Sequence, residues 1–273
     1  MQHCEARMKI CALLGGILDP KWPLPPHDYL RRPEMLDGIA RKLSPFDDAA
    51  LEVALRLRET MPSSTLAVYM PDGPGAEGLM RAVAAHKPDQ VGLLAIDQAV
   101  RWDVTAFARQ AAAGLRDADA GTLWLTGREF GDLDDGAFGA CLARAAAASL
   151  IAMAEELRVD AHGTLRALRT RTDVTEQVRV PDACVVTLTN ARSNRLRHPL
   201  MKNVMLAKKL AIDRVACNSN AGSDGTAAAR VAPALLLSAA EANRPRAVRL
   251  PASAGLDAQL NAVLELLCTA SPT

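Results

Sequence analysis

The residues between Gly127 and Gly139, GREFGDLDDGAFG, combine glycines with acidic side chains directly after a short apolar run. Glycines such as Gly136 permit positive φ angles and a close approach of the backbone to a ligand. The Ala-rich residues that follow indicate a helix, and a helix that begins near Gly136 would point its free N–H groups at an anion such as a phosphate. A second interpretation is that Asp134 or Asp135 caps this helix and satisfies the same N–H groups internally.

Apart from this loop, the sequence offers no pattern typical of acid–base, nucleophilic or metal chemistry. Its five histidines form no HExxH pair, and it has no GxSxG motif of the kind that carries a nucleophilic serine on an α/β sheet. The cysteines are far apart and form no CxxC, so we interpret them as small buried residues of a protein in a reducing compartment. They are Cys4, Cys11, Cys141, Cys184, Cys217 and Cys268. We therefore expect no catalytic residue and no metal ligand.

The composition argues against two kinds of partner. With 32 basic and 31 acidic residues the net charge is +1, so the chain lacks the positive charge typical of nucleic-acid binding. Only 3% of the residues are aromatic, too few to favour a surface that stacks single-stranded bases. No run reaches the roughly 18 apolar residues of a membrane span, and the N-terminal residues lack the pattern of a secretion signal. We expect a cytoplasmic protein, and the Ala- and Arg-rich composition favours a bacterial one.

The first 150 residues alternate between buried strands and amphipathic helices. The expected strands are continuous apolar runs, as in parallel strands that are covered on both faces. One helix has a strong start signal, because Ser44 is a good N-cap, Pro45 takes the first helical position and Asp47 comes close to completing a capping box. The alternation predicts a doubly wound, mostly parallel α/β sheet that binds ligands at the carboxyl ends of its strands. The expected strands are residues 9–14, 64–70, 91–96 and 121–127, with helices at 43–59 and 103–118.

After residue 150 the sequence changes to short β-rich segments with tight turns at residues 161–163 and 172–174. We expect these segments, residues 183–189 included, to add antiparallel strands to the sheet. A polar loop then leads to a short basic helix. Residues 218–226 indicate a flexible linker before a last amphipathic helix at 256–267. The sequence thus predicts one α/β domain over residues 1–217 and a C-terminal extension over residues 218–273.

Three blocks of sequence resemble the β subunit of electron-transfer flavoproteins, a family that includes nitrogen-fixation-associated members. Residues 43–59, LSPFDDAALEVALRLRE, are similar to N-P-F-(D/E)-x-x-A-(L/V)-E-x-A-L-R-L-K-E. Residues 127–143 resemble, without gaps, G-K-Q-A-I-D-x-D-x-x-x-x-G-x-x-L-A. Residues 183–209 resemble P-A-V-V-T-(V/A)-x-x-x-x-N-E-P-R-(Y)-x-x-L-P-N-I-M-K-A-K-K. The blocks keep the family's order and spacing, so the resemblance runs from about residue 8 to about residue 213.

The resemblance implies an adenine-nucleotide α-hydrolase-like fold and a heterodimer. An α subunit would hold most of the FAD, while this chain would bury an AMP and complete the shell around the flavin. The complex would carry electrons from a flavin dehydrogenase to an acceptor such as a quinone oxidoreductase. The residues that match the family's AMP and flavin positions are Leu13, Ser44, Pro45, Phe46, Met70, Gly127, Arg128, Asp132, Asp134, Gly136, Ala137, Phe138 and Gly139. The segment that matches the loop that docks the dehydrogenase is Leu200, Met201, Lys202 and Asn203.

The chain departs from the family pattern at the AMP loop. The family's polar phosphate-binding positions are Gly136, Ala137 and Phe138 here, and Asp135 adds an acid that would repel a phosphate. AMP binding and an internally capped loop therefore both stay open. Arg128 stands in place of the family's lysine and keeps a positive charge nearby.

Structural roles stay open for other matched residues. Leu13 and Met70 fit a buried strand end as well as a contact with adenine, and Ser44–Phe46 fit a helix cap with the phenylalanine in the core. One of Leu200 and Met201 could pack beneath its own loop rather than meet a dehydrogenase.

The hairpin RTRTDVTE also departs from the family pattern. It keeps Arg169 and Glu176 but has Thr170 in place of a glutamate and lacks the family's glycines, so we expect the α partner's surface to differ too. Two functions follow from the sequence. The first is an electron-carrying subunit in which the flavin does the redox chemistry. The alternative is a nucleotide-binding or structural interaction protein of the same fold without a redox role.

Overall fold

The computed structural model describes residues 8–22, 39–97, 100, 103–115, 121–132, 136–172, 174–217 and 255–269. The chain divides into two units, Met1–Ala228 and Ala229–Thr273. In the second unit the described element is helix α7 (Leu256–Thr269), at the place where the sequence predicts the last helix. The linker expected at 218–226 lies outside the described residues, and the domain boundary after residue 217 stays a prediction.

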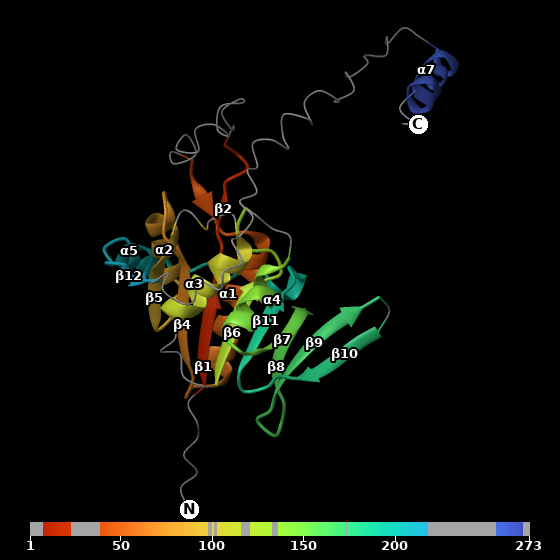
Figure 1. The fold of residues 1–273 in the computed structure, drawn as a ribbon. Helices are drawn as coiled ribbons and strands as arrows, with labels where there is room; N and C mark the ends of the chain where they lie inside the picture. Colours follow the sequence, from red (N-terminus) through yellow and green to blue (C-terminus); the bar gives the residue numbers. More distant parts are fainter. Residues whose placement is uncertain are drawn as a thin grey trace, which may run out of the picture. The chain divides into compact units, whose positions relative to one another are not determined.

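The first unit is built on a seven-stranded sheet in the order β12-β5-β4-β1-β6-β11-β7, and all of its strands pair in parallel (Figure 1). The chain passes from β1 to β4 and β5 on one side and then returns to β6 on the other side of β1. The order therefore reverses between β1 and β6, where sheets of this kind bind ligands. The strands are β1 (Lys9–Leu13), β4 (Thr65–Pro71), β5 (Gln90–Ala95), β6 (Thr122–Gly127), β7 (Ser149–Ala154), β11 (Cys184–Leu188) and β12 (Asp213–Ala216).

Helices cover both faces of this sheet. Helices α1 (Pro45–Thr60) and α2 (Ala76–Ala84) pack on one face, and α3 (Val104–Gly114) and α4 (Phe138–Ala145) pack on the other. A short helix, α5 (Met201–Ala207), contacts α2. Together with the parallel sheet, this arrangement confirms the doubly wound α/β fold.

The starts of α1 and α3 form as the sequence predicts. The Ser44 hydroxyl accepts a hydrogen bond from the Asp47 amide at 3.0 Å, and the Asp47 carboxylate accepts one from the Ser44 amide at 3.0 Å. This reciprocal pair completes the capping box that the sequence nearly satisfies. Asp103 caps α3 by accepting from the amides of Thr105 and Ala106. Both caps therefore fix helix starts at the carboxyl edge of the sheet.

The β-rich segments after residue 150 divide between two sheets. Strands β8 (Glu156–Val159), β9 (Leu165–Arg171) and β10 (Val174–Arg179) form a separate antiparallel sheet, which confirms extra antiparallel strands. The antiparallel expectation was wrong for residues 183–189 and also for residues 150–154, because β11 pairs in parallel with both β6 and β7. Every residue of β11 is buried, Thr187 included, and such continuous burial is the pattern of a parallel strand covered on both faces.

Successive residues of the strands enter two hydrophobic clusters, one on each face of the sheet. In β1, Ile10 and Ala12 join the cluster under α1 and α2, whereas Cys11 and Leu13 join the cluster under α3 and α4. Cys11, Cys141, Cys184 and Cys217 are free, and all of them except Cys141 are buried, as expected of small core residues. Burial raises the pKa of the Cys184 thiol to about 11, so it stays protonated and acts as a small apolar side chain.

Candidate functional site

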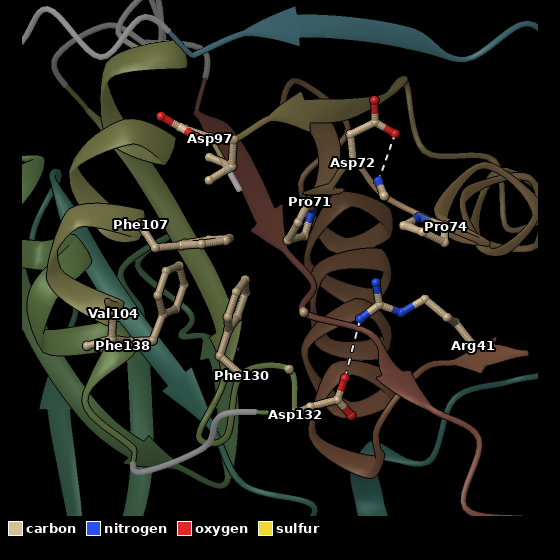
Figure 2. A pocket seen from close by; sticks show the side chains of 14 residues that line it. Arg41, Pro71, Asp72, Pro74, Asp97, Val104, Phe107, Phe130, Asp132 and Phe138 are labelled. Atoms are coloured by element: carbon tan, nitrogen blue, oxygen red, sulfur yellow. Dashed lines mark hydrogen bonds and ion pairs between the residues drawn. The ribbon is translucent and has the colours of Figure 1, made fainter. Parts of the chain in front are cut away.

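A cavity of about 80 Å³ opens at the carboxyl edge of the main sheet, where the strand order reverses (Figure 2). The cavity is lined by residues at and just beyond the carboxyl ends of four neighbouring strands. Helices α3 and α4 close one side of it. Pockets that enclose a drug-sized ligand usually measure roughly 300–1,000 Å³, so this space is small. The described lining residues are Gly15, Arg41, Pro71, Asp72, Gly73, Pro74, Ile96, Asp97, Val104, Phe107, Phe130, Gly131, Asp132 and Phe138.

Three aromatic rings form one wall of the cavity. Phe130 stacks on Phe138 with ring centroids 3.7 Å apart, and Phe107 meets both rings edge-on at 5.7 and 5.8 Å. Figure 2 shows these rings gathered opposite Pro71 and Arg41. The chain has only four phenylalanines, yet three meet here. Sequence reasoning missed Phe107 and Phe130, because their common destination is visible only once α3 and the loop after β6 are placed.

Charged groups form the opposite wall. The Asp132 carboxylate accepts a hydrogen bond from the Leu18 amide at 2.9 Å and pairs with the Arg41 guanidinium at 3.4 Å. These bonds join the loop after β6 to β2 (Ile17–Leu18) and β3 (Arg41–Lys42), a short antiparallel pair that the sequence does not predict. Asp72 pairs with Arg214 of β12 at 2.9 Å. Both carboxylates therefore already have a guanidinium partner.

A buried carboxylate organises the backbone beside this cavity. Asp47 is fully buried and accepts hydrogen bonds from the amides of Gly15 at 2.8 Å and Gly16 at 3.0 Å, in addition to that of Ser44. Burial raises the pKa of Asp47, while these amide donors and the Ser44 hydroxyl act in the opposite direction. The carboxyl group thus ties the end of β1 to the start of α1 through its hydrogen bonds.

The predicted AMP residues divide between two hollows. Asp132 and Phe138 line the cavity of Figure 2, whereas Arg128 and Gly136 line a second hollow of about 520 Å³. The second hollow lies at the carboxyl ends of β7 and β11, next to the exposed side chain of Met153. Its described lining residues are Arg128, Glu129, Gly136, Ala140, Leu150, Ala152, Met153 and Thr187.

The residues at the start of α1 come close to Arg128. The Arg128 guanidinium lies 5.4 Å from the centroid of the Phe46 ring and pairs with Glu129 at 2.6 Å. Ser44 acts as the helix cap, and Pro45 is exposed beside it. The predicted cofactor-binding residues Ser44–Phe46 and Arg128, the latter from the AMP loop, therefore lie together.

The start of α4 is packed against the sheet. Helix α4 begins at Phe138 with Ala137 at the N-cap, and Gly136 has a φ of 73°, the left-handed conformation expected of a glycine there. A Cβ on Gly139 would lie 2.2 Å from Thr187 Cγ2, so this glycine permits close packing of α4 on β11. Asp134 lies outside the described residues.

Leu13, Met70 and Gly127 are buried at strand ends, in the positions that the plain structural interpretation predicts. Leu13 belongs to the cluster under α3 and α4, and Met70 to the cluster under α1 and α2. None of the three is among the described residues that line the cavity, so contact between them and an adenine ring stays a prediction.

The predicted docking segment lies at the exposed start of α5. The side chains of Leu200 and Met201 are 71% and 74% exposed, so neither of them packs beneath the loop. Lys202 is also exposed and Asn203 is partly buried. Three further apolar side chains that the sequence analysis did not select are exposed on or directly after α5. They are Met205, Leu206 and Leu210.

An ion pair between a buried carboxylate and a partly exposed guanidinium holds the segment that precedes α5. Glu52 of α1 is only 6% exposed and accepts hydrogen bonds from Arg197, the shortest at 2.8 Å. Burial by itself would raise the pKa of Glu52, but the hydrogen bonds and charge of Arg197, with the charge of Arg56, together lower it. Asn194 is buried and donates to the Glu155 carbonyl at 2.6 Å. Asn194 and Arg197 therefore anchor this segment to the fold.

No group of three or more His, Cys, Asp or Glu side chains in the described part of the chain could hold a metal ion. Over the same residues, no helix has the length and apolar character needed to cross a bilayer.

A parallel α/β sheet with a cavity at the reversal of its strand order is typical of proteins that bind nucleotides and related cofactors. The family model for the electron transfer flavoprotein domain matches residues 36–220, which is more than half of the chain. The chain belongs to this family, whose members are flavin-dependent electron carriers. No curated protein matches the chain.

Proposed function

We propose that this chain is the β subunit of a heterodimeric electron-transfer flavoprotein. It would shuttle electrons from a flavin dehydrogenase to a downstream acceptor, such as a quinone oxidoreductase, with an FAD held mainly by the α subunit. The observation that carries the proposal is the family match over residues 36–220. We place this complex in the cytoplasm of a bacterium.

The exposed face of α5 supports docking of the dehydrogenase. Leu200, Met201, Met205, Leu206 and Leu210 are all more than 40% exposed, an apolar surface that suits a partner protein. Methionine side chains adapt to different surfaces, which helps a carrier that must meet more than one protein. The ion pair below this segment would keep it in position while partners exchange.

Two further features agree with a β subunit. Arg169 and Glu176, the hairpin residues that match the family, lie opposite each other in β9 and β10 and pair at 2.6 Å. We expect this antiparallel sheet to face the α subunit. We expect Ser44–Phe46 and Arg128 to lie nearest the edge of the flavin.

The residues present do not fit AMP, the nucleotide that the resemblance assigns to this chain. Phe138 takes a position where the family has a polar phosphate ligand, and its ring is stacked on Phe130 rather than open to a ligand. We therefore assign AMP no part in the function of this chain.

Co-expression with a flavin-bearing candidate α subunit tests the proposal. We expect the two chains to elute together from gel filtration as a yellow complex whose flavin is reduced by a dehydrogenase and its substrate. A colourless chain that pairs with none of the candidate subunits would instead favour the alternative, a binding or structural protein of the same fold.

A variant of α5 tests the docking role within that complex. Met201→Glu places a charge in the apolar surface and should slow flavin reduction by the dehydrogenase at least tenfold, roughly the effect of losing one interface hot spot, while the complex stays yellow. Met201→Leu should retain the rate, because it keeps an apolar side chain. Ser63→Glu, which adds the same charge in an exposed turn between α1 and β4, is the control. Equal rates in all four proteins would rule out docking through Met201.

A further inference from the structure

We propose that this chain fills its nucleotide site with its own side chains and therefore binds no nucleoside monophosphate there. The site is the cavity of Figure 2 together with residues 127–132 and 136–139. The inference concerns this chain alone and does not depend on which proteins exchange electrons with it. Three groups of contacts carry it.

The first group is the aromatic wall. At the start of α4, where a helix could present free N–H groups to a phosphate, Phe138 is only 2% exposed and stacks on Phe130 at 3.7 Å. Phe107 of α3 meets both rings at edge-to-face distances, so each ring has aromatic partners within the protein. A phosphate could reach this place only if the stacked pair separated and exposed its apolar faces.

The second group closes the loop onto the end of β1. The backbone of Gly131 lies so near Gly15 that a Cβ on Gly15 would come within 2.2 Å of the Gly131 nitrogen. Gly15 thus allows a backbone contact that a side chain would prevent, and Gly131 takes a left-handed φ of 68°. The bonds of Asp132 to Leu18 and Arg41 fasten the next residue of the loop. Because the loop is held on both sides, Phe130 is directed towards the other two rings, and the cavity that remains is about 80 Å³.

The third group is electrostatic. Asp72, Asp97 and Asp132 line the cavity, whereas Arg41 is the one basic residue among its described lining residues. Arg41 already pairs with Asp132, so the guanidinium that faces the cavity is partly neutralised. The amides of Gly15 and Gly16 after β1 cannot donate to a phosphate in place of a basic residue, because the buried carboxylate of Asp47 already accepts their hydrogen bonds. A phosphate entering this cavity would meet several carboxylates and would lose its water without gaining equivalent partners.

Analysis of bound nucleotide tests the proposal without any variant. The full chain, purified with its partner subunit, is denatured in acid, and the released nucleotides are separated by chromatography. We expect the flavin cofactor but far less than one AMP per chain. Recovery of about one nucleoside monophosphate per chain would overturn the proposal. A complex without flavin would instead contradict the proposed redox function, so the two failures are distinguishable.

A second experiment tests whether the aromatic rings are what excludes phosphate. The variant Phe130→Ala/Ala137→Gln/Phe138→Thr removes the stacked pair and adds polar groups. The matched control is Phe130→Leu/Phe138→Leu, which removes the stacked pair but adds no polar group. Thermal melts are recorded with and without about 1 mM AMP. A ligand that binds only the folded state raises the melting temperature, so a rise reports binding of AMP.

We expect AMP to raise the melting temperature of the polar variant by at least about 3 °C and to leave the wild type and the leucine variant unchanged. An equal rise for the wild type would overturn the proposal. A folded polar variant that does not respond to AMP would also contradict it, because the rings would then not be what excludes the phosphate. If the polar variant does not fold, the proposal is tested by the first experiment, the nucleotide content of the wild-type complex.

Discussion

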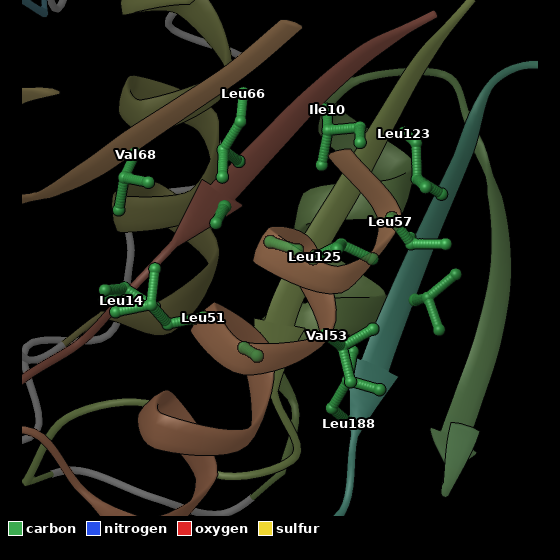
Figure 3. Packing of buried hydrophobic residues seen from close by; sticks show 14 of the residues in the cluster. Ile10, Leu14, Leu51, Val53, Leu57, Leu66, Val68, Leu123, Leu125 and Leu188 are labelled. Carbon is green, nitrogen blue, oxygen red and sulfur yellow. The ribbon is translucent and has the colours of Figure 1, made fainter. Parts of the chain in front are cut away.

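The two faces of the main sheet differ in what their helices bury. Under α1 and α2 the cluster is mainly aliphatic and closed, as the packing of Leu51, Val53 and Leu57 against Leu123 and Leu125 shows (Figure 3). Under α3 and α4 the cluster contains the rings of Tyr69, Phe107, Trp124 and Phe138, and it borders the cavity at the carboxyl edge. The same strands supply both clusters through alternate residues.

This difference indicates that the two faces of the sheet have different roles. The aliphatic face holds α1 against the central strands and provides a rigid base. The aromatic face carries the loop that resembles the family's ligand loop, and its large flat side chains border the cavity. The comparison predicts that substitutions on the first face reduce stability most, and that substitutions on the second face have smaller effects.

The largest effect is expected from Leu125→Ala. Leu125 of β6 is fully buried beneath α1, and the truncation should lower the free energy of unfolding by about 3–4 kcal/mol because the closed packing cannot collapse around the cavity left behind. Urea denaturation measures the change. Leu206→Ala on the exposed face of α5 is the control and should change stability by less than about 0.5 kcal/mol. Equal losses in the two variants would contradict the proposed rigid base.

Phe107→Ala should cost less, about 2 kcal/mol, although the side chain removed is larger. Phe107 borders the cavity, so water can enter the space that its ring leaves, and the cost of an empty void is avoided. The remaining stacked pair, Phe130 and Phe138, loses only its edge-on partner. Urea denaturation of this variant and of Leu125→Ala under the same conditions measures the two losses in the free energy of unfolding. A loss larger than that of Leu125→Ala would reverse the comparison between the two faces.

Local sequence patterns predicted most of the scaffold. The capping box at Ser44 and Asp47 and the alternation of strand and helix depend on residues close together in the chain, and both are found in the structure. The direction of β11 was missed, because a segment's pairing depends on strands far away in the sequence. Weight given to the continuous apolar run at residues 183–186 would have corrected this prediction.

The site was predictable only in part. Similarity to known motifs selected the loop from Gly127 to Gly139, but the contacts of Asp132 with Leu18 and Arg41 span 114 and 91 residues of sequence. The aromatic wall needs α3, the loop after β6 and α4 to meet in space, so no local pattern reveals it. The exposure of Leu200 and Met201 likewise became known only when α5 was placed on α2.

Acidic residues of α1 allow the aliphatic face to be tested by pH. Glu52 has a pKa below its ordinary 4.5, so its contribution to stability is present above that value and is lost as the pH falls through the folded-state pKa. Glu52→Gln should therefore cost about 1–2 kcal/mol at neutral pH, because Arg197 loses its charged partner. The difference from the wild type should shrink as the pH is lowered below about 4. Urea denaturation across this range measures it, and a constant difference would show that charge is not involved.

Asp48, in the same helix as Glu52, should show the opposite behaviour and the smallest effect. Burial, with the charge of Asp47, raises its pKa from 3.8 to about 6, while Lys42 opposes the shift. The folded state then holds a proton that the unfolded state has released, so stability falls as the pH rises from about 4 to about 6. Asp48→Asn removes this titration and should stabilise the protein by about 1 kcal/mol at neutral pH, since solvent screens part of the effect at a half-buried site. At pH 4 the variant and the wild type should unfold at the same urea concentration. The opposite result, a variant less stable than the wild type at neutral pH, would contradict this prediction. It would mean that the negative charge of Asp48 stabilises the N-terminal end of α1 by more than the burial of that charge costs.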